Sequence, residues 1–357
     1  MTFIKTCISA ILFASSTLVL VTVIGIGLFV IQQAQPKPQQ YDPVKIGLLQ
    51  YIVFLSPIID GFKEGMAELG YVEGRDIVYT EKELALEFTQ MQSATQRIIQ
   101  QNPDLIFAVS SVAARAALQE TSNSGRTDIP VVFSHAFNAV EGDGAFVASY
   151  RSSGNNATGI EVSFEELTAK KLDFLERINR VERLVVFEPL HPDSIDFPTP
   201  AVLAELKDKA LGFGTELVIL PIESAPGEAG DAEIQQLLDS LQPGDIDAYF
   251  HVPSHITDTP ENVNRVLAMV ERLQIPSAWT NQVQVRDLGG LLTVEEDLHA
   301  MGKQNAFMAD KILRGIAPQN IPIEFGRSQN LYINTATAQK FGITIPADIL
   351  QIANTVD

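Results

Sequence analysis

The chain has 357 residues, 46% of them apolar, which exceeds one average domain and suffices for two lobes of about 120–150 residues, each with its own core. Lys5 and Lys37 are the only charged residues in the first 40 positions, so the rest carries 23 basic and 44 acidic side chains, an excess of acid that argues against nucleic acid or anionic lipid as partners. Cys7 is the only cysteine, which excludes disulfides, cysteine zinc sites and thiol catalysis from the remainder of the chain.

The first predicted element is the uncharged run over residues 7–31. As a helix rising about 1.5 Å per residue it would span a hydrocarbon layer of about 30 Å. A cleaved signal peptide has a shorter apolar region and a small-x-small cleavage site, which the sequence QQAQP at 32–36 does not offer. We therefore predict a cytoplasmic segment 1–6, an uncleaved transmembrane signal anchor 7–31 and a polar linker 32–43, with a cleaved signal as the alternative. The protein would then be single-pass in the inner or cytoplasmic membrane, with its soluble domain in the periplasm or outside the cell.

From residue 44 onward, strand and helix patterns alternate, which is typical of parallel sheets covered by helices. In the first half we expect strands at 44–50, 76–79, 105–109 and 131–134, and helices at 58–69, 91–101 and 112–120. In the second half we expect strands at 183–187, 216–220, 248–252 and 277–280, and helices at 202–211, 234–241 and 263–273. The order of elements is the same in the two halves.

Turn residues recur with the same order. Gly70 and Pro103 lie 33 positions apart in the first half, and Gly212 and Pro243 lie 31 apart in the second. A duplicated lobe explains this agreement. Two α/β lobes that face each other leave a cleft at the carboxyl ends of their strands, where open parallel sheets bind ligands.

Ten short segments, in order along this body, carry a resemblance to known proteins. They are 61–74 (GFKEGMAELGYVEG), 103–106 (PDLI), 110–114 (SSVAA), 129–134 (IPVVFS), 157–160 (ATGI), 289–294 (GGLLTV), 301–302 (MG), 311–315 (KILRG), 331–334 (LYIN) and 341–346 (FGITIP). Together they resemble the family of ABC-transporter substrate-binding proteins whose better-known members bind aromatic amino acids.

The resemblance implies a type I periplasmic-binding fold: two Rossmann-like lobes with a central ligand cleft and a few crossovers between them. We expect lobe 1 to comprise residues 44–160 plus about 291–318, and lobe 2 to comprise 161–290 plus about 319–357. The implied function is the extracytoplasmic binding of a small-molecule solute, an amino acid or related carboxylate, by hinge closure. The implied partners are the ABC permease subunits in the membrane, and no cofactor is implied.

Four cleft segments depart from the family pattern. An Asp-Pro turn is replaced by HAFNAV at 135–140, an Asn-Ser pair by HPDS at 191–194, an Asp-Asn pair by Ser254-His255, and a late aromatic pair by Leu298-His299. The resemblance therefore supports the scaffold more than it supports any particular solute.

In lobe 1, Ser110 and Ser111 end a strand and open a helix. A serine there caps the helix, and the exposed N–H groups favour a carboxylate or other anion. His135 and Asn138 follow the next strand and could hydrogen-bond a ligand. The alternatives are an ordinary N-cap and ordinary loop residues.

In lobe 2, the corresponding loops supply polar candidates that could equally be solvated loop residues: Asp193, Ser194, Ser254, His255 and Thr280. Tyr51 and Trp279 could flank an apolar part of the ligand, although large aromatic residues beside strands are more often core.

No catalytic constellation or metal site is predicted. His251 and His255 are four positions apart, but Pro253 between them at a strand end rules out the helix that such a metal pair needs. Asp245 and Asp247 resemble a glycosyltransferase metal motif, yet they stand where the first half has a turn acid. A membrane-anchored sensory module and a membrane-anchored glycosyltransferase remain as alternatives to the solute-binding role.

Overall fold

The computed structural model describes residues 42–80, 83–85, 88–142, 144–195 and 198–357. The predicted anchor at 7–31 and nearly all of the linker at 32–43 lie outside the described residues. Among the helices of the described part, none combines the length and apolar character needed to cross a bilayer.

The first sheet is parallel throughout, with the strand order β12-β6-β5-β4-β1-β2 and with β3 beside β1. Its strands are β1 (Val44–Gln50), β2 (Ile77–Tyr79), β3 (Glu83–Leu84), β4 (Leu105–Val109), β5 (Val131–Ala136), β6 (Ala157–Glu161) and β12 (Glu324–Phe325). Four long helices cover it, namely α2 (Ser56–Glu68), α3 (Phe88–Gln100), α4 (Ser111–Asn123) and α10 (Leu298–Leu313).

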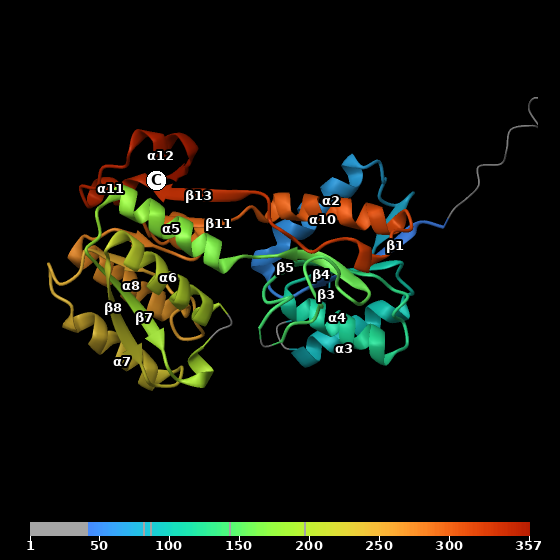
Figure 1. Cartoon of the computed structure of the whole chain (residues 1–357), viewed down its shortest axis with the longest axis horizontal. Helices are drawn as coiled ribbons and strands as arrows, with labels where there is room; N and C mark the ends of the chain where they lie inside the picture. Colours follow the sequence, from blue (N-terminus) through green and yellow to red (C-terminus); the bar gives the residue numbers. More distant parts are fainter. Residues whose placement is uncertain (1–41, 81–82, 86–87, 143, 196–197) are drawn as a thin grey trace, which may run out of the picture. The chain divides into compact units, whose positions relative to one another are not determined.

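Both faces of this sheet are covered (Figure 1). Helices α2 and α10 share one core with Leu48 and Phe107, whereas α3 and α4 share another with Leu49 and Ile106. Successive strand residues point to opposite faces, so both must be apolar, and β4 is accordingly buried over its whole length.

The second sheet has the order β14-β13-β11-β10-β9-β7-β8 and is parallel except for the β11–β13 pair. Its strands are β7 (Arg183–Pro189), β8 (Glu216–Ile222), β9 (Ala248–Phe250), β10 (Ser277–Ala278), β11 (Leu292–Glu296), β13 (Gln329–Asn334) and β14 (Asn354–Val356). The helices of this lobe are α5 (Phe164–Ile178), α6 (Thr199–Phe213), α7 (Glu228–Ser240), α8 (Pro260–Leu273), α9 (Gln282–Arg286), α11 (Thr335–Lys340) and α12 (Ala347–Ile352). Three short 3₁₀ turns complete the described elements, at Val53–Leu55, Pro192–Ser194 and Pro318–Asn320.

Every strand and helix predicted for the two halves is present, with ends that shift by a few residues. The two-lobed α/β architecture is therefore confirmed, and each lobe repeats the β-α order that the spacing of turn residues indicated. The long helices obey ordinary capping rules. For example, the side chains of Ser163 and Thr259, which precede α5 and α8 respectively, each accept a hydrogen bond from the backbone N–H at the third position of the helix.

The predicted lobe limits at about 291 and about 319 are corrected by the strand pairing. Strand β11 joins the second sheet, between β10 and β13, and β12 joins the first sheet beside β6. The chain therefore passes between the lobes at 162–163, at Asp297 and at 326–328. The sequence of an apolar strand does not reveal which sheet it joins, because its hydrogen-bonding partners are strands far away in the sequence.

Helix α10 returns to the first lobe and packs against α2 at very short range. A Cβ built on Gly302 would lie 2.0 Å from the carbonyl oxygen of Ile58, and one built on Gly61 would lie 2.0 Å from that of His299. Only glycine fits at such a crossing. The close approach fixes the start of α10, and with it Leu298, beside the carboxyl ends of the strands.

Candidate ligand-binding site

A cavity of about 590 Å³ lies where loops from the carboxyl ends of both sheets meet. This volume is typical of small-molecule sites. The first lobe contributes side chains at or just after the carboxyl ends of β1, β4 and β5, and the second contributes side chains at or after the carboxyl ends of β9, β10 and β11. Its apolar wall contains Ile52, Phe54, Leu55, Val112, Phe137, Val162, Phe164, Leu167, Pro198, Pro253 and Leu298.

The first-lobe wall is formed around the start of α4. The hydroxyl of Ser110 accepts from the N–H of Ala113 at 3.2 Å, so this serine caps the helix as the sequence predicted. Arg115, one turn along, also lines the cavity, and its guanidinium has no hydrogen bond or ion pair within the described part of the chain. A guanidinium without a partner among the described residues and a helix N-terminus both give this wall positive potential, which favours an anion over a cation here.

The backbone of this wall is strained. Ser110, His135 and Asn138 have φ values of 113°, 49° and 48°, which non-glycine residues rarely adopt. Such conformations persist where the surrounding structure imposes them, and they cluster at functional sites. Burial lowers the pKa of His135 to about 4, so its imidazole is neutral at pH 7 and offers one donor and one acceptor.

The second-lobe wall is acidic, with Asp258, Glu295 and Glu296 in it. Both glutamates are buried, and burial raises the pKa of each to about 7. Glu295 accepts from the N–H of Gln282 at 2.8 Å. One carboxylate oxygen of Glu296 accepts from Gln329, and the other has no hydrogen-bond partner in the described structure.

Two further polar groups complete this wall. Thr280 lies in the cavity, and its buried hydroxyl has no partner among the described residues. Lys171 on α5 is 4% exposed and lies close enough to Glu295 and Asp258 for both carboxylates to raise its pKa, although burial has the larger effect and lowers that pKa to about 8. The second-lobe wall thus places three carboxyl groups, those of Asp258, Glu295 and Glu296, in the cavity, with the ammonium of Lys171 near two of them.

Five of the ten predicted ligand residues lie in the cavity. They are Tyr51, Ser110, His135, His255 and Thr280. They come from both halves of the chain, so the structure brings these five residues together around one cavity, and their contact with a ligand stays a prediction.

The other five do not line the cavity: three serines form hydrogen bonds elsewhere, and Asp193 and Asn138 lie in turns outside it. Ser111 exchanges two hydrogen bonds with the backbone of Phe137, Ser194 donates to the carbonyl of Ser224, and Ser254 bonds Thr257. Asp193 is exposed in a 3₁₀ turn, and Asn138 lies in the turn after β5. Trp279 is a core residue, fully buried, with its ring N–H donating to Ser277.

The sequence reading missed the charged residues of the cavity. Arg115 is three positions after Val112, so the same face of α4 carries both, and this spacing was the signal available for it. Glu295 and Glu296 end a strand that the resemblance placed in the wrong lobe. Asp258 follows β9 by eight positions in an irregular turn, and no sequence signal pointed to it.

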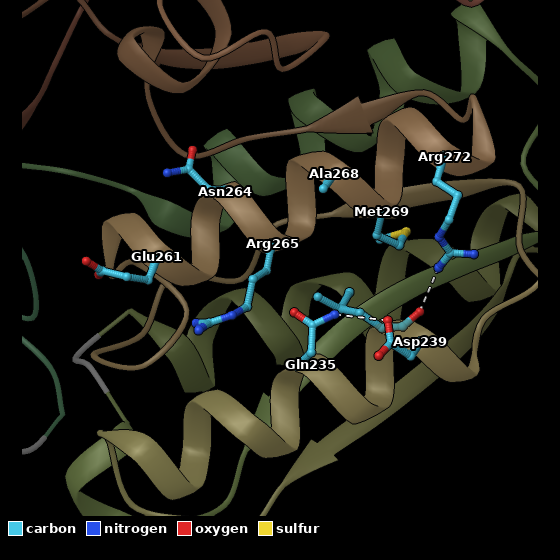
Figure 2. A pocket seen from close by; sticks show the side chains of 9 residues that line it. Gln235, Asp239, Glu261, Asn264, Arg265, Ala268, Met269 and Arg272 are labelled. Carbon is cyan, nitrogen blue, oxygen red and sulfur yellow. Dashed lines mark hydrogen bonds between the residues drawn. The ribbon is translucent and has the colours of Figure 1, made fainter.

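A second hollow, of about 510 Å³, lies between α7 and α8, away from the strand ends (Figure 2). Its two arginines already have partners. Arg272 donates to the carbonyls of Leu238 and Leu241, and Arg265 donates to Asn262. The cations of this groove are therefore less available to a solute than Arg115 is.

The acids of the glycosyltransferase-like motif have structural roles. Asp245 accepts from the N–H of Gln242, and Asp247 accepts from the N–H groups of Glu182 and Arg183. Both lie at the amino end of β9, whereas the cavity is at the carboxyl end. In the described residues, no cluster of His, Cys, Asp and Glu could hold a metal ion.

With this geometry established, comparison with known proteins gives a family. The family described as ABC transporter substrate binding protein matches residues 54–357. The chain belongs to this family. Its members bind small solutes, work with ABC permeases and are generally non-enzymatic. A comparison with curated protein sequences found no significant match.

Solved structures show the same type I periplasmic-binding fold at low identity. An ABC domain from Streptococcus pneumoniae in complex with L-Trp has a TM-score of 0.68 and 19% identity, over 88% of this chain and 100% of that one. A ligand-free, open substrate-binding protein with adhesive properties from Clostridium difficile has a TM-score of 0.72 and 21% identity, over 88% and 99%. A solute-binding protein from Agrobacterium vitis bound with alpha-D-tagatopyranose has a TM-score of 0.54 and 12% identity, over 87% and 99%.

Proposed function

We propose that the protein is the extracytoplasmic solute-binding component of an ABC importer, held at the membrane by residues 7–31. We further propose that its solute is an amino acid or a related small carboxylate that carries an amine. The observation that carries this proposal is the different chemistry of the two cavity walls: the first lobe presents a guanidinium that has no partner among the described residues, and the second presents three carboxyl groups.

The first-lobe wall suits the carboxylate of such a solute. Arg115 can donate two parallel hydrogen bonds to a carboxylate, and the N-terminus of α4 adds N–H groups that have no intrahelical partner. A neutral sugar would leave the guanidinium unpaired in a partly desolvated cavity, which is unfavourable. The L-Trp bound by the Streptococcus pneumoniae neighbour carries both a carboxylate and an amine, whereas the tagatose bound by the Agrobacterium vitis neighbour carries neither.

The second-lobe wall suits the ammonium. Asp258, Glu295 and Glu296 line the cavity, with the ammonium of Lys171 near the first two, and an ammonium on the solute would favour the ionised form of these carboxyl groups and be attracted by them. Thr280 offers a hydroxyl with no other partner, so binding would also satisfy a buried polar group.

The space between the two walls is apolar and partly aromatic. Tyr51, Phe54, Phe137 and Phe164 lie in it, and the rings of Phe137 and Phe164 meet edge to face with centroids 5.7 Å apart. This supports a solute with an apolar or aromatic body between its charged groups and the cavity mouth.

Closure follows from the requirement that one solute contact both lobes. Three crossovers join the lobes, so a change in a few backbone angles there would move one lobe against the other. A solute stabilises the closed state only by the contacts that it makes in that state and lacks in the open one. A permease that recognises the closed arrangement would then receive loaded protein selectively.

The test is a thermal-shift and calorimetric screen of the purified full-length protein in detergent against the twenty L-amino acids, small carboxylates and sugars. At a hundredfold excess over Kd, binding adds about 2.7 kcal/mol to the free energy of unfolding, enough to raise Tm by about 5–10 °C. Small-angle scattering of the same samples should show a more compact particle with each hit. Hits confined to uncharged sugars, or a compact particle that is unchanged by every hit, would refute the proposal.

A sensory module with the same fold is the second candidate, because an anchored binding protein could signal to a membrane partner instead of feeding a pore. Co-purification from solubilised membranes separates the two roles. Recovery of ABC permease subunits supports import, whereas recovery of a signalling protein without them supports sensing.

A further inference from the structure

A buried chain of hydrogen bonds leads from the core of the second lobe to the cavity. The hydroxyl of Tyr249 lies 2.9 Å from Nδ1 of His251, and Nε2 of His251 lies 2.8 Å from a carboxylate oxygen of Asp258. Tyr249 and His251 belong to the core and are 1% and 0% exposed, whereas Asp258 lines the cavity. The hydrogen bonds thus run without a break from Tyr249 in the core, through His251, to Asp258 at the cavity.

The partners assign the protons. An ionised carboxylate only accepts hydrogen bonds, so Nε2 of His251 carries the proton that it donates to Asp258. Nδ1 is then the acceptor, and Tyr249 donates to it. The ring is also fixed in position, because it stacks on Trp279 with centroids 5.2 Å apart and 20° between planes.

These contacts hold the Asp258 carboxylate from two sides. One oxygen accepts from His251, and the other accepts from the backbone N–H of Ser254 at 3.1 Å. The remaining lone pairs are left for the cavity. Lys171 attracts the same carboxylate, yet no hydrogen bond or ion pair between Lys171 and Asp258 is present in the described structure.

We propose that His251, backed by Tyr249, is a positioning residue that holds Asp258 toward the cavity and thereby selects solutes with a primary amine over their deaminated analogues. The inference rests on the proposed function, because it needs a solute between the lobes. Without the imidazole, Asp258 would turn toward Lys171 and be lost to the solute. His251 and His255 are spaced like a metal-binding pair in the sequence, and this positioning role would explain why His251 is a histidine.

The experiment measures selectivity, because a purely structural role for His251 would weaken all solutes alike. Full-length His251→Phe, which keeps a flat ring against Trp279, is compared with the parent by calorimetry. Each L-amino acid that binds the parent is paired with the carboxylic acid that lacks its α-amine, such as L-tryptophan with indole-3-propionate. His251→Phe should weaken the amine-bearing member about tenfold or more and leave the deaminated member within about twofold.

Two further variants separate positioning from damage to the core. His251→Gln places a side-chain N–H near the position of Nε2, so it should restore selectivity to within about threefold of the parent. His299→Phe removes an exposed histidine that contacts only Glu64 among the described acids, and it should leave both affinities unchanged. If circular dichroism shows that His251→Phe does not fold, Tyr249→Phe is used in its place. This variant should lower the preference for the amine-bearing compound over its deaminated analogue by about threefold.

The outcomes are decisive in each direction. Equal loss of affinity for both members of a pair, or no rescue by His251→Gln, would overturn the role of His251 while the proposed function stands. Parent protein that binds deaminated acids as tightly as amino acids would overturn this inference and the amine requirement of the proposed solute, while the solute-binding role stands. If no compound of either kind binds the parent, both the proposed function and this inference fail.

Discussion

The carboxyl of Glu161 gives the sharpest stability prediction, because it is buried at the first crossover between the lobes. It is 5% exposed, and one of its oxygens has no hydrogen-bond partner in the described structure. Burial raises its pKa from the ordinary 4.5 to about 7, although the backbone N–H groups of Ala139 and Asn138 oppose the shift. A shift of this size corresponds to roughly 3 kcal/mol at 1.36 kcal/mol per pKa unit.

The sign follows from proton binding. Between pH 4.5 and 7 the folded protein keeps a proton on Glu161 that the unfolded chain has lost, so the free energy of unfolding falls as the pH rises through this window. Above about pH 7 the penalty is complete. Glu161→Gln removes the ionisable group, so the variant should match the parent near pH 4 and exceed it by up to about 3 kcal/mol at pH 8.

The assay is differential scanning calorimetry of parent and Glu161→Gln from pH 4 to 8. At about 2 °C per kcal/mol, we expect the variant's advantage in Tm to grow from near zero to about 6 °C. Glu216→Gln, which changes an exposed glutamate, is the matched control and should stay within about 0.5 kcal/mol throughout. An advantage that does not change with pH, or a variant that is less stable at pH 8, would refute the reasoning from burial.

Three other changes test the packing, the cavity and the turn. Gly302→Ala should lower the free energy of unfolding measured in urea by about 1–3 kcal/mol, because its Cβ would lie 2.0 Å from the carbonyl oxygen of Ile58. The control Gly212→Ala should be neutral or stabilising, because its Cβ would have no heavy atom within 4 Å. Arg115→Gln should weaken any carboxylate-bearing hit about tenfold or more without lowering Tm, and an unchanged Kd would show that the anion lies elsewhere. Asp247→Ala should destabilise the protein by about 1–2 kcal/mol but leave affinity unchanged, and a loss of nucleotide-sugar hydrolysis on the same change would revive the enzymatic alternative.

The sequence indicated the fold well because the relevant signals are local. Pro103 and Pro243 each follow a helix and precede a buried strand. Each helix–turn–strand unit can be predicted from its own residues, without knowledge of what it packs against. The inner strand β11 and the edge strand β12 were placed in the wrong lobes, because their assignment depends on pairing with residues far away in sequence.

The cavity was predictable mainly where a residue stands close to a strand end, and His255, five positions after β9, is the exception. Ser110, His135 and Thr280 satisfy that rule and line the cavity. Ser111 satisfies it too, but its hydroxyl is engaged by Phe137, a contact between two loops that spacing cannot show. Asp258 lies eight positions after the end of β9, and its carboxylate accepts hydrogen bonds from His251 and Ser254, contacts that spacing along the sequence cannot show.

The return of α10 to the first lobe has a consequence for biogenesis. Lys303 of α10 pairs with Glu64 and Glu68 of α2, which lie 239 and 235 positions earlier in the sequence. Until residue 313 has emerged, α2 lacks the helix that covers its apolar side, and Phe62 and Met66 lack much of their packing. We therefore expect that the amino-terminal half does not fold independently during synthesis, and that a chain truncated before α10 would expose this surface to chaperones, proteases and aggregation.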